Sequence, residues 1–211
     1  MSYLRVRREY STETVIRKSR FITTLVPISD WDDALVHLQR IRKTYSDATH
    51  NCYAAICDTC GNVQRFSDDG EPQGTAGMPM LDVLRKRNIR MTLAVVTRYF
   101  GGIKLGAGGL VSAYTAGVAD ALDQAELDEY LPSVRIEVVC SYSDASIVTD
   151  RMLACGAEPM PPVYDTQVSI TAHVPTPQAN RLCDALRDAT NGRASVSVAE
   201  EGEYPFAVRT E

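Results

Sequence analysis

The amino-acid sequence predicts an α+β protein with two domains. Short segments that alternate apolar and polar residues, as strands of half-buried sheets do, occur in both halves of the chain. Between them lie segments with an apolar residue every three or four positions, the pattern of helices that pack on a sheet. The acidic segment 123–132 ends in proline and separates the two sets, so we expect domains at residues 1–127 and 132–211.

The first domain is expected to contain both kinds of element. Its strands are predicted by alternation or, in the last case, by an apolar run buried on both faces. They cover residues 10–28 (a strand pair or one bent strand), 50–58, 62–67 and 92–97. Its helices are predicted after a cap at Ser29 or Asp30, from about Pro79 to Arg87, and from Gly108 to about Ala125.

The sequence of the second domain predicts the order strand, helix, two strands, helix, strand, which is the βαββαβ order of ferredoxin-like domains. The strands are expected over 134–142, around Val163, over 168–174 and over 194–199, and the helices from Asp144 to Cys155 and from Thr176 to Ala189. One face of this sheet would carry polar residues and no aromatic residue. We therefore expect that face to pack or to dock a protein rather than to stack bases.

The net charge and its distribution along the chain limit the kinds of partner that the protein can bind. The net charge of −5 argues against indiscriminate binding to nucleic acid, and we expect no DNA specificity. Residues 1–127 contain 16 lysines and arginines against 14 aspartates and glutamates, whereas residues 128–211 contain 6 against 13. A polyanion should therefore prefer the first domain, and the acidic second domain is the candidate for a protein partner.

Six cysteines lie in a chain that shows no signal peptide and no apolar run long enough to cross a bilayer. We therefore expect a cytoplasmic protein with reduced thiols and no membrane partner. Cys57 and Cys60 have the spacing of half a zinc site or of a redox pair. No second such pair exists to complete four ligands, so neither role is predicted.

The strongest functional signal is a glycine-rich segment between a strand and a helix. Five glycines in nine residues let the backbone approach another group, and the helix start offers free N–H donors, a combination that suits a phosphate or carboxylate. The alternative, that the glycines only permit a tight turn, stays open. Neither Walker A nor GxGxxG is present, so no nucleotide cofactor is predicted. The candidate anion-binding or RNA-binding residues are Arg98, Tyr99, Gly101, Gly102, Lys104, Gly106, Gly108 and Gly109.

An acidic turn precedes this segment. Its carboxylates could hold Mg²⁺ through water, although a solvated turn is the commoner arrangement. His50 has no identifiable nucleophile partner and is expected to be a hydrogen-bonded structural residue. We predict no catalytic residue, no metal ligand and no cofactor. The residues expected to line the site are His50, Asp68, Asp69, Glu71 and Thr75.

Three segments around the glycine-rich stretch are distinctive: FSDDGEP at 66–72, GTAG at 74–77, and VTRYFGG at 96–102. Together they resemble the YigZ/IMPACT family, strongly over about residues 15–125 and mainly in element order beyond them. The resemblance implies a first domain of the ribosomal protein S5 domain 2-like fold and a ferredoxin-like second domain. Both are similar to consecutive domains of elongation factor G, which implies contact with the ribosome or structured RNA. Eukaryotic members regulate translation through an additional N-terminal domain that we do not expect in this chain.

Three hypotheses follow. The first is a non-enzymatic protein that regulates translation by binding the ribosome or structured RNA through its first domain. The second is a Mg²⁺-dependent enzyme acting on a phosphorylated small molecule, by analogy with kinases of the same fold. The third is a scaffold that binds only a protein partner.

Overall fold

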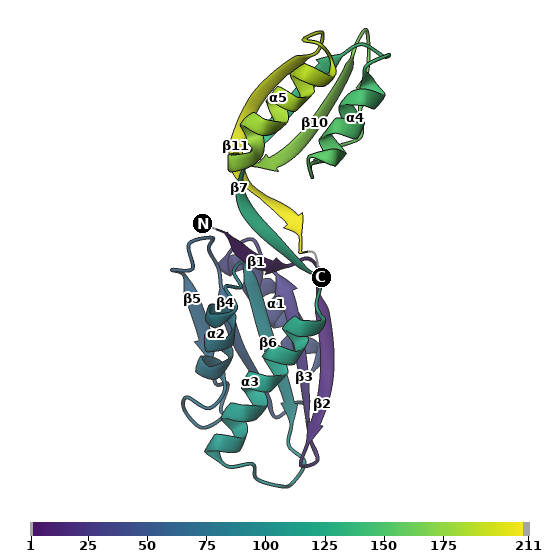
Figure 1. Cartoon of the computed structure of the whole chain (residues 1–211). Helices are drawn as coiled ribbons and strands as arrows, with labels where there is room; N and C mark the ends of the chain where they lie inside the picture. The colour runs from purple at the N-terminus through teal and green to yellow at the C-terminus, as the bar shows by residue number, and fades with distance from the viewer. Residues whose placement is uncertain (1, 209–211) are drawn as a thin grey trace. The chain divides into compact units, whose positions relative to one another are not determined.

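The computed structural model describes residues 2–208 and contains two sheets and five α-helices, which confirms the α+β class (Figure 1). It divides into two compact units. The first contains residues 3–129 and 207–208, and the second contains residues 130–206. The acidic segment that we expected between the domains is not a loop throughout, because strand β7 (Leu127–Cys140) begins within it and holds residues of both units.

The first unit is built on an antiparallel five-stranded sheet in the order β2-β3-β6-β4-β5. The central strand β6 is buried along nearly its whole length, as its apolar sequence predicts. Strands β2 and β3 are a true pair, joined by a tight turn in which Arg17 and Lys18 have φ of 47° and 66°. The strands are β2 Tyr10–Ile16, β3 Ser19–Pro27, β4 His50–Ile56, β5 Gln64–Ser67 and β6 Thr92–Tyr99.

Helices cover both faces of this sheet (Figure 1). Helix α1 (Trp31–Thr44) shares a core with one face and is capped by Asp30, whose carboxylate accepts a hydrogen bond from Asp33 N at 2.8 Å. Helices α2 (Gly77–Lys86) and α3 (Ala107–Gln124) share the core of the other face. The sheet is therefore the middle layer, and the start of α3 lies at the end of the central strand.

Helix α2 begins two residues before the position that Pro79 suggests. The Asp68 carboxylate accepts hydrogen bonds from Ala76 N at 3.0 Å and Gly77 N at 2.8 Å, which satisfies the free donors of an earlier start. Gly77 also sits against β5, because a Cβ there would lie 2.8 Å from the backbone of Ser67. A cap supplied from eight or nine residues upstream leaves no local pattern in the sequence.

The sequence pattern also misses strand β1 (Tyr3–Val6), which lies next to β7 in the six-stranded sheet. Backbone hydrogen bonds hold β1 to the segment after α2: Leu4 N donates to Asn88 O at 3.0 Å and Arg90 N donates to Leu4 O at 2.8 Å. Four residues are too few to show an alternation, so the pairing partners define this strand rather than its own sequence.

The second unit has its strands in the order β11-β7-β10-β8, with β9 also paired to β10. Helices α4 (Ala145–Ala154) and α5 (Ala179–Ala189) pack against the sheet in one core. The expected strand near Val163 is present only as two short pieces. The remaining strands are β8 Glu158–Pro159, β9 Val163–Tyr164, β10 Val168–Pro175 and β11 Ser195–Ala207.

The expectation that the polar face of this sheet carries no aromatic residue is wrong. Strand β11 continues past residue 199, where we expected it to end, and brings Tyr204 onto His173 of that face. The two rings stack with centroids 3.6 Å apart and planes at 15°. Three glutamates and a glycine at residues 200–203 interrupt the alternation and conceal this extension in the sequence. Burial lowers the pKa of His173 from its ordinary value, so the stacked imidazole is held toward its neutral form.

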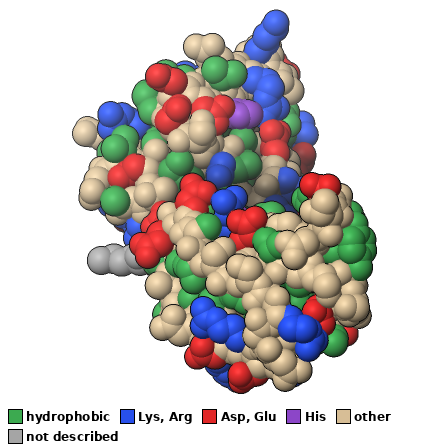
Figure 2. Space-filling view, turned by 90° about the horizontal axis from the view of Figure 1, so that it is seen from above, with side chains coloured by type: hydrophobic (Ala, Val, Ile, Leu, Met, Phe, Trp, Pro, Cys, Tyr) green, Lys and Arg blue, Asp and Glu red, His purple; other side chains and the backbone are tan. Residues whose placement is uncertain are grey.

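No helix within residues 2–208 is long and apolar enough to cross a lipid bilayer. On the face shown in Figure 2, basic and acidic side chains are interspersed and do not form a large patch of one sign. Many arginines of the first unit are paired with nearby carboxylates; examples are Arg7 with Asp128 at 2.6 Å and Arg20 with Glu13 at 2.9 Å. The unpaired cations are therefore more informative about binding than the total charge.

Candidate functional site

The loop between β6 and α3 contains three glycines with structural roles. Gly101 packs against the β2–β3 turn, because a Cβ there would lie 2.1 Å from the carbonyl carbon and oxygen of Lys18. Gly102 and Gly106 have φ of 84° and 77°, which side chains rarely adopt. The structural alternative therefore accounts for these three positions.

The remaining two glycines lie in the first turn of α3. A Cβ on Gly108 would meet no atom within 4 Å, so packing does not require glycine there. Gly109 is tighter, with Leu105 Cβ at 3.1 Å. Gly106 is the N-cap and has no side chain to accept hydrogen bonds, and no other residue among 2–208 caps the first N–H groups of this 18-residue helix. Free N–H groups and the helix dipole favour an anion at this point.

A hollow of about 340 Å³ lies beside the start of α3, and we call it the α3 hollow. Its walls are mainly apolar and its floor contains a buried ion pair. Phe100 is 46% exposed at its edge, and Lys104 is exposed. The lining residues are Glu71, Pro72, Arg98, Phe100, Lys104, Leu105, Gly106, Ala107 and Leu110.

The floor of the α3 hollow is formed by Glu71 and Arg98. Their atoms Oε1 and Nη1 are 2.6 Å apart, and the two side chains are only 3% and 6% exposed. The Tyr114 hydroxyl also donates to Oε1, at 2.8 Å. The second oxygen, Oε2, accepts no hydrogen bond within residues 2–208, and His50 Nε2 lies 3.8 Å from it. Glu71 therefore offers one free acceptor toward the hollow.

Arg98, which we expected to contact an anion or RNA, is buried and paired with Glu71. Its Nη2 donates to Ser19 Oγ at 3.4 Å, and its guanidinium lies 5.3 Å from the ring of Phe21 and 5.6 Å from that of Phe100. These contacts hold the guanidinium beneath the hollow. Tyr99 does not line the hollow; its hydroxyl donates to Asp47 at 2.7 Å.

The acidic turn does not bring its three carboxylates together. Asp68 caps α2 and also accepts from Gly74 N at 2.8 Å. Asp69 accepts from Asn51 N at 2.6 Å and pairs with Arg42 at 2.8 Å. Within residues 2–208, no group of three or more His, Cys, Asp or Glu side chains is arranged to hold a metal ion. The turn therefore does not build the magnesium site of the second hypothesis from these side chains.

His50 and Thr75 make local hydrogen bonds. His50 Nδ1 lies 2.8 Å from Asp69 O, a carbonyl that can only accept, so Nδ1 carries the proton. This fits the structural role expected for His50. Thr75 Oγ1 donates to Pro72 O at 2.6 Å, and the residue is buried outside the lining of the α3 hollow.

Sequence reasoning missed the part that Tyr114 and Cys52 play beneath the hollow. Burial raises the pKa of the Cys52 thiol to about 12 and also raises the pKa of Tyr114. Both groups therefore stay protonated, and Tyr114 keeps the proton that it donates to Glu71. Tyr114 lies within the predicted helix, but no local signal in the sequence joins it to a glutamate 43 positions earlier.

The CxxC pair is split between two environments. Cys57 is buried and Cys60 is exposed, and both are free thiols. Burial raises the pKa of Cys57 to about 11, and the thiolate is the reactive form. We expect iodoacetamide at about pH 8 to label Cys60 quickly and to leave Cys52 and Cys57 unlabelled until urea unfolds the chain. Peptide mass mapping measures this, and labelling of Cys57 as fast as Cys60 would contradict it.

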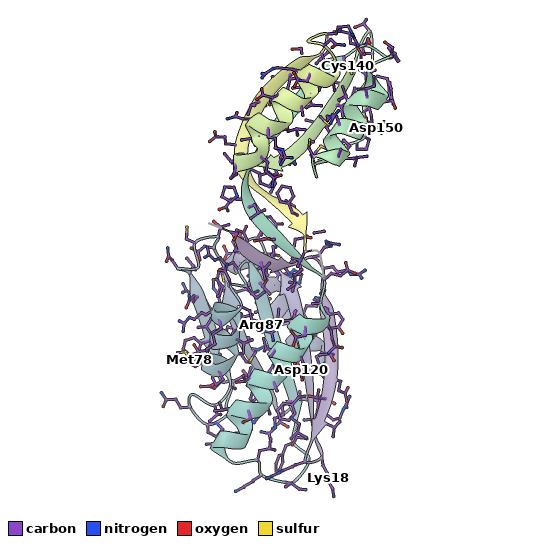
Figure 3. All side chains as sticks on the ribbon, in the orientation of Figure 1. Lys18, Met78, Arg87, Asp120, Cys140 and Asp150 are labelled. Atoms are coloured by element: carbon purple, nitrogen blue, oxygen red, sulfur yellow. The ribbon has the colours of Figure 1, made fainter. Side chains whose placement is uncertain are left out.

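Three unpaired cations surround the glycine-rich loop. Arg17, Lys18 and Lys104 are exposed and form no ion pair within residues 2–208. Figure 3 places Lys18 at the same end of the first unit as the start of α3. A second hollow of about 330 Å³ includes Arg17 and shares Leu105 with the α3 hollow. The start of α3 thus has a basic rim, which we define as Arg17, Lys18 and Lys104.

Comparison with known proteins establishes the family. The Impact N-terminal domain family matches residues 17–122. IMPACT family member YvyE of Bacillus subtilis (strain 168) is 36% identical over 205 residues, which cover 97% of this chain and 93% of YvyE. The chain belongs to the YigZ/IMPACT family.

Other relatives extend the family's range. Protein IMPACT of Oryctolagus cuniculus is 36% identical over 94 residues, which are 43% of this chain and 29% of that protein. A solved crystal structure of a hypothetical protein is 32% identical with a TM-score of 0.60, and the match covers 94% of this chain and 98% of that one. The match to the YigZ/IMPACT family domain includes every residue that lines the α3 hollow.

Proposed function

We propose that this member of the YigZ/IMPACT family is a non-enzymatic, translation-associated protein that binds the ribosome or structured RNA in the cytoplasm. The observation that carries the proposal is the uncapped start of α3, which opens beside the α3 hollow and the basic rim. Helix N–H groups, Lys104, Arg17 and Lys18 together suit the phosphates of an RNA backbone. Arg98 supports the site from below and is not assigned a phosphate contact.

We further propose that the first unit has the ribosomal protein S5 domain 2-like fold and that the second is ferredoxin-like. The strand order β11-β7-β10-β8 with two helices in one core supports the second assignment. This pair resembles consecutive domains of elongation factor G, which favours a ribosomal partner. The acidic composition of the second unit suits orientation of the protein or contact with a basic protein surface rather than RNA.

Co-sedimentation with ribosomes across a salt series tests the proposal. We expect association at low salt that weakens steeply as salt rises, because phosphate contacts release counterions. Replacing the basic rim (Arg17→Gln, Lys18→Gln, Lys104→Gln) should weaken association and lower the salt slope by about one per lost phosphate contact. Lys43→Gln is the matched control, since Lys43 is an exposed lysine of α1 without an ion pair within residues 2–208.

The result can also contradict the proposal. If the protein does not associate with ribosomes at low salt, the assignment of the basic rim is wrong. It is also wrong if the triple variant and Lys43→Gln lose the same affinity per charge removed. Association that is insensitive to salt and to all of these substitutions would instead favour a protein-binding scaffold.

A further inference from the structure

We propose that the α3 hollow binds one unpaired nucleotide of an RNA. Its phosphate would lie at the start of α3 beside Lys104, its base against Phe100, and a hydroxyl or amino group of its sugar or base would donate to Glu71 Oε2. This inference rests on the proposed function and specifies the ligand of that site.

The size and shape of the hollow match a single nucleotide. At about 340 Å³ it lies at the lower end of the range of small-ligand sites. A stacked base pair needs a broad surface, whereas an extruded nucleotide fits a pocket with an aromatic wall. The basic rim lies outside the hollow and can continue along the backbone of neighbouring nucleotides.

Phe100 is positioned to stack on a base. It follows β6 directly and is 46% exposed although it is a large apolar residue. The Arg98 guanidinium lies 5.6 Å from the ring centre, and Arg98 is itself held by Glu71. Arg98 therefore supports the Phe100 ring from within the protein, and part of the ring is exposed to solvent. Stacking on a supported aromatic ring is tolerant of base identity and is the usual way in which single strands are bound.

The free oxygen of Glu71 suits a ligand that carries a hydrogen-bond donor. Its side chain is 3% exposed and lines the hollow, yet Oε2 accepts no hydrogen bond within the described residues. His50 does not supply one, because its Nε2 lies 3.8 Å from Oε2, beyond hydrogen-bond distance, and its Nδ1 faces Asp69 O. A simple anion such as sulfate has no donor for this oxygen. A ribonucleotide has one in its ribose hydroxyls, and most bases have amino or imino groups as well.

The start of α3 provides the complementary acceptor site. Cβ atoms on Gly106 and Gly108 would meet nothing within 4 Å, so the backbone there is open to a close approach. The first N–H groups of the helix and Lys104 would then contact a phosphate, while the buried Glu71 carboxylate, which lines the same hollow, would accept from a donor. A nucleotide combines these features at the two ends of one molecule and places an aromatic base between apolar walls.

Fluorescence anisotropy with labelled oligonucleotides tests this inference on the full chain. A short single-stranded RNA should bind at least about tenfold more tightly than the same sequence in a duplex. Phe100→Leu should weaken single-strand binding by about 5- to 150-fold. Phe66→Leu, the same substitution at a phenylalanine that is 43% exposed on β5, should change it by less than about twofold. Phe100 is exposed, so its variant is expected to fold.

Two further comparisons separate the possible donors. Weaker binding of single-stranded DNA assigns the donor to the ribose 2′-hydroxyl, and a preference among homopolymeric RNAs assigns it to a base. Equal binding of duplex and single strand, or equal effects of Phe100→Leu and Phe66→Leu, overturns the inference even when ribosome association persists. If the wild-type protein binds neither RNA nor ribosomes, the proposed function itself is overturned. The two failures are therefore distinguishable.

Discussion

Gly101→Ala is expected to lower the free energy of unfolding of the first unit by about 3 kcal/mol or more. The added Cβ would lie 2.1 Å from Lys18 C and O and 2.5 Å from Ser19 N. These are backbone atoms of the β2–β3 turn, so no flexible side chain can move aside. To make room for the added Cβ, the loop after β6 and the β2–β3 hairpin must separate. This separation disturbs the pairing of β3 with β6. Urea unfolding followed by the fluorescence of Trp31, the single tryptophan, measures the effect in this unit.

Gly108→Ala is the matched control within the same segment. Its Cβ would meet nothing within 4 Å, and its φ is not in the left-handed region. Because alanine lowers the backbone entropy of the unfolded chain, this variant should be neutral or stabilised by up to about 1 kcal/mol. A similar loss in both variants would show that the glycines share one role. The expected contrast separates glycines required by packing from the glycine at the open helix start.

This contrast also marks the limit of sequence reasoning at the site. Five glycines near a strand-to-helix junction indicated a special loop, and a loop joins β6 to α3 there, with two of the glycines in the first turn of the helix. The local sequence could not assign a role to each glycine. The atoms that exclude a side chain at Gly101 belong to Lys18 and Ser19, about 80 residues earlier. Such a contact is fixed by the pairing of β3 with β6 and not by neighbouring residues.

The same reasoning explains which elements could be predicted. Strand β6 and helix α3 are long and strongly patterned, so their existence and type follow from the sequence. Strand β1 and the end of β11 are held by their partners and carry no clear alternation. Within the site, Glu71 lies among the residues of the α3 hollow, but its partners Arg98 and Tyr114 were not predictable. The pairing of Glu71 with Arg98 and Tyr114 depends on where the acidic turn, β6 and α3 meet. Only the packing of these elements in the folded unit determines that arrangement.

Arg98→Met is expected to destabilise the first unit by about 3–5 kcal/mol. The substitution preserves much of the side-chain volume but leaves the Glu71 carboxylate, 3% exposed, without its cation. Tyr114 then remains the single hydrogen-bond donor to that carboxylate within the described residues. An uncompensated buried charge costs more than the ion pair contributes, so the variant measures the penalty of leaving Glu71 alone. Urea unfolding by Trp31 fluorescence reports it, with Arg20→Met as the control at an exposed pair that should change little.

The double variant Arg98→Met/Glu71→Gln decides whether charge is the cause. Glutamine keeps a carbonyl that can accept from the Tyr114 hydroxyl but carries no charge, so the double variant should be more stable than Arg98→Met alone. If the double variant is as unstable as the sum of the two single variants, the loss comes from packing against Phe21 and Phe100 instead. Recovered stability with a neutral floor would show that Arg98 acts in the α3 hollow mainly by compensating the charge of Glu71. Lys104 and the start of α3 would then remain as the groups that face an anion.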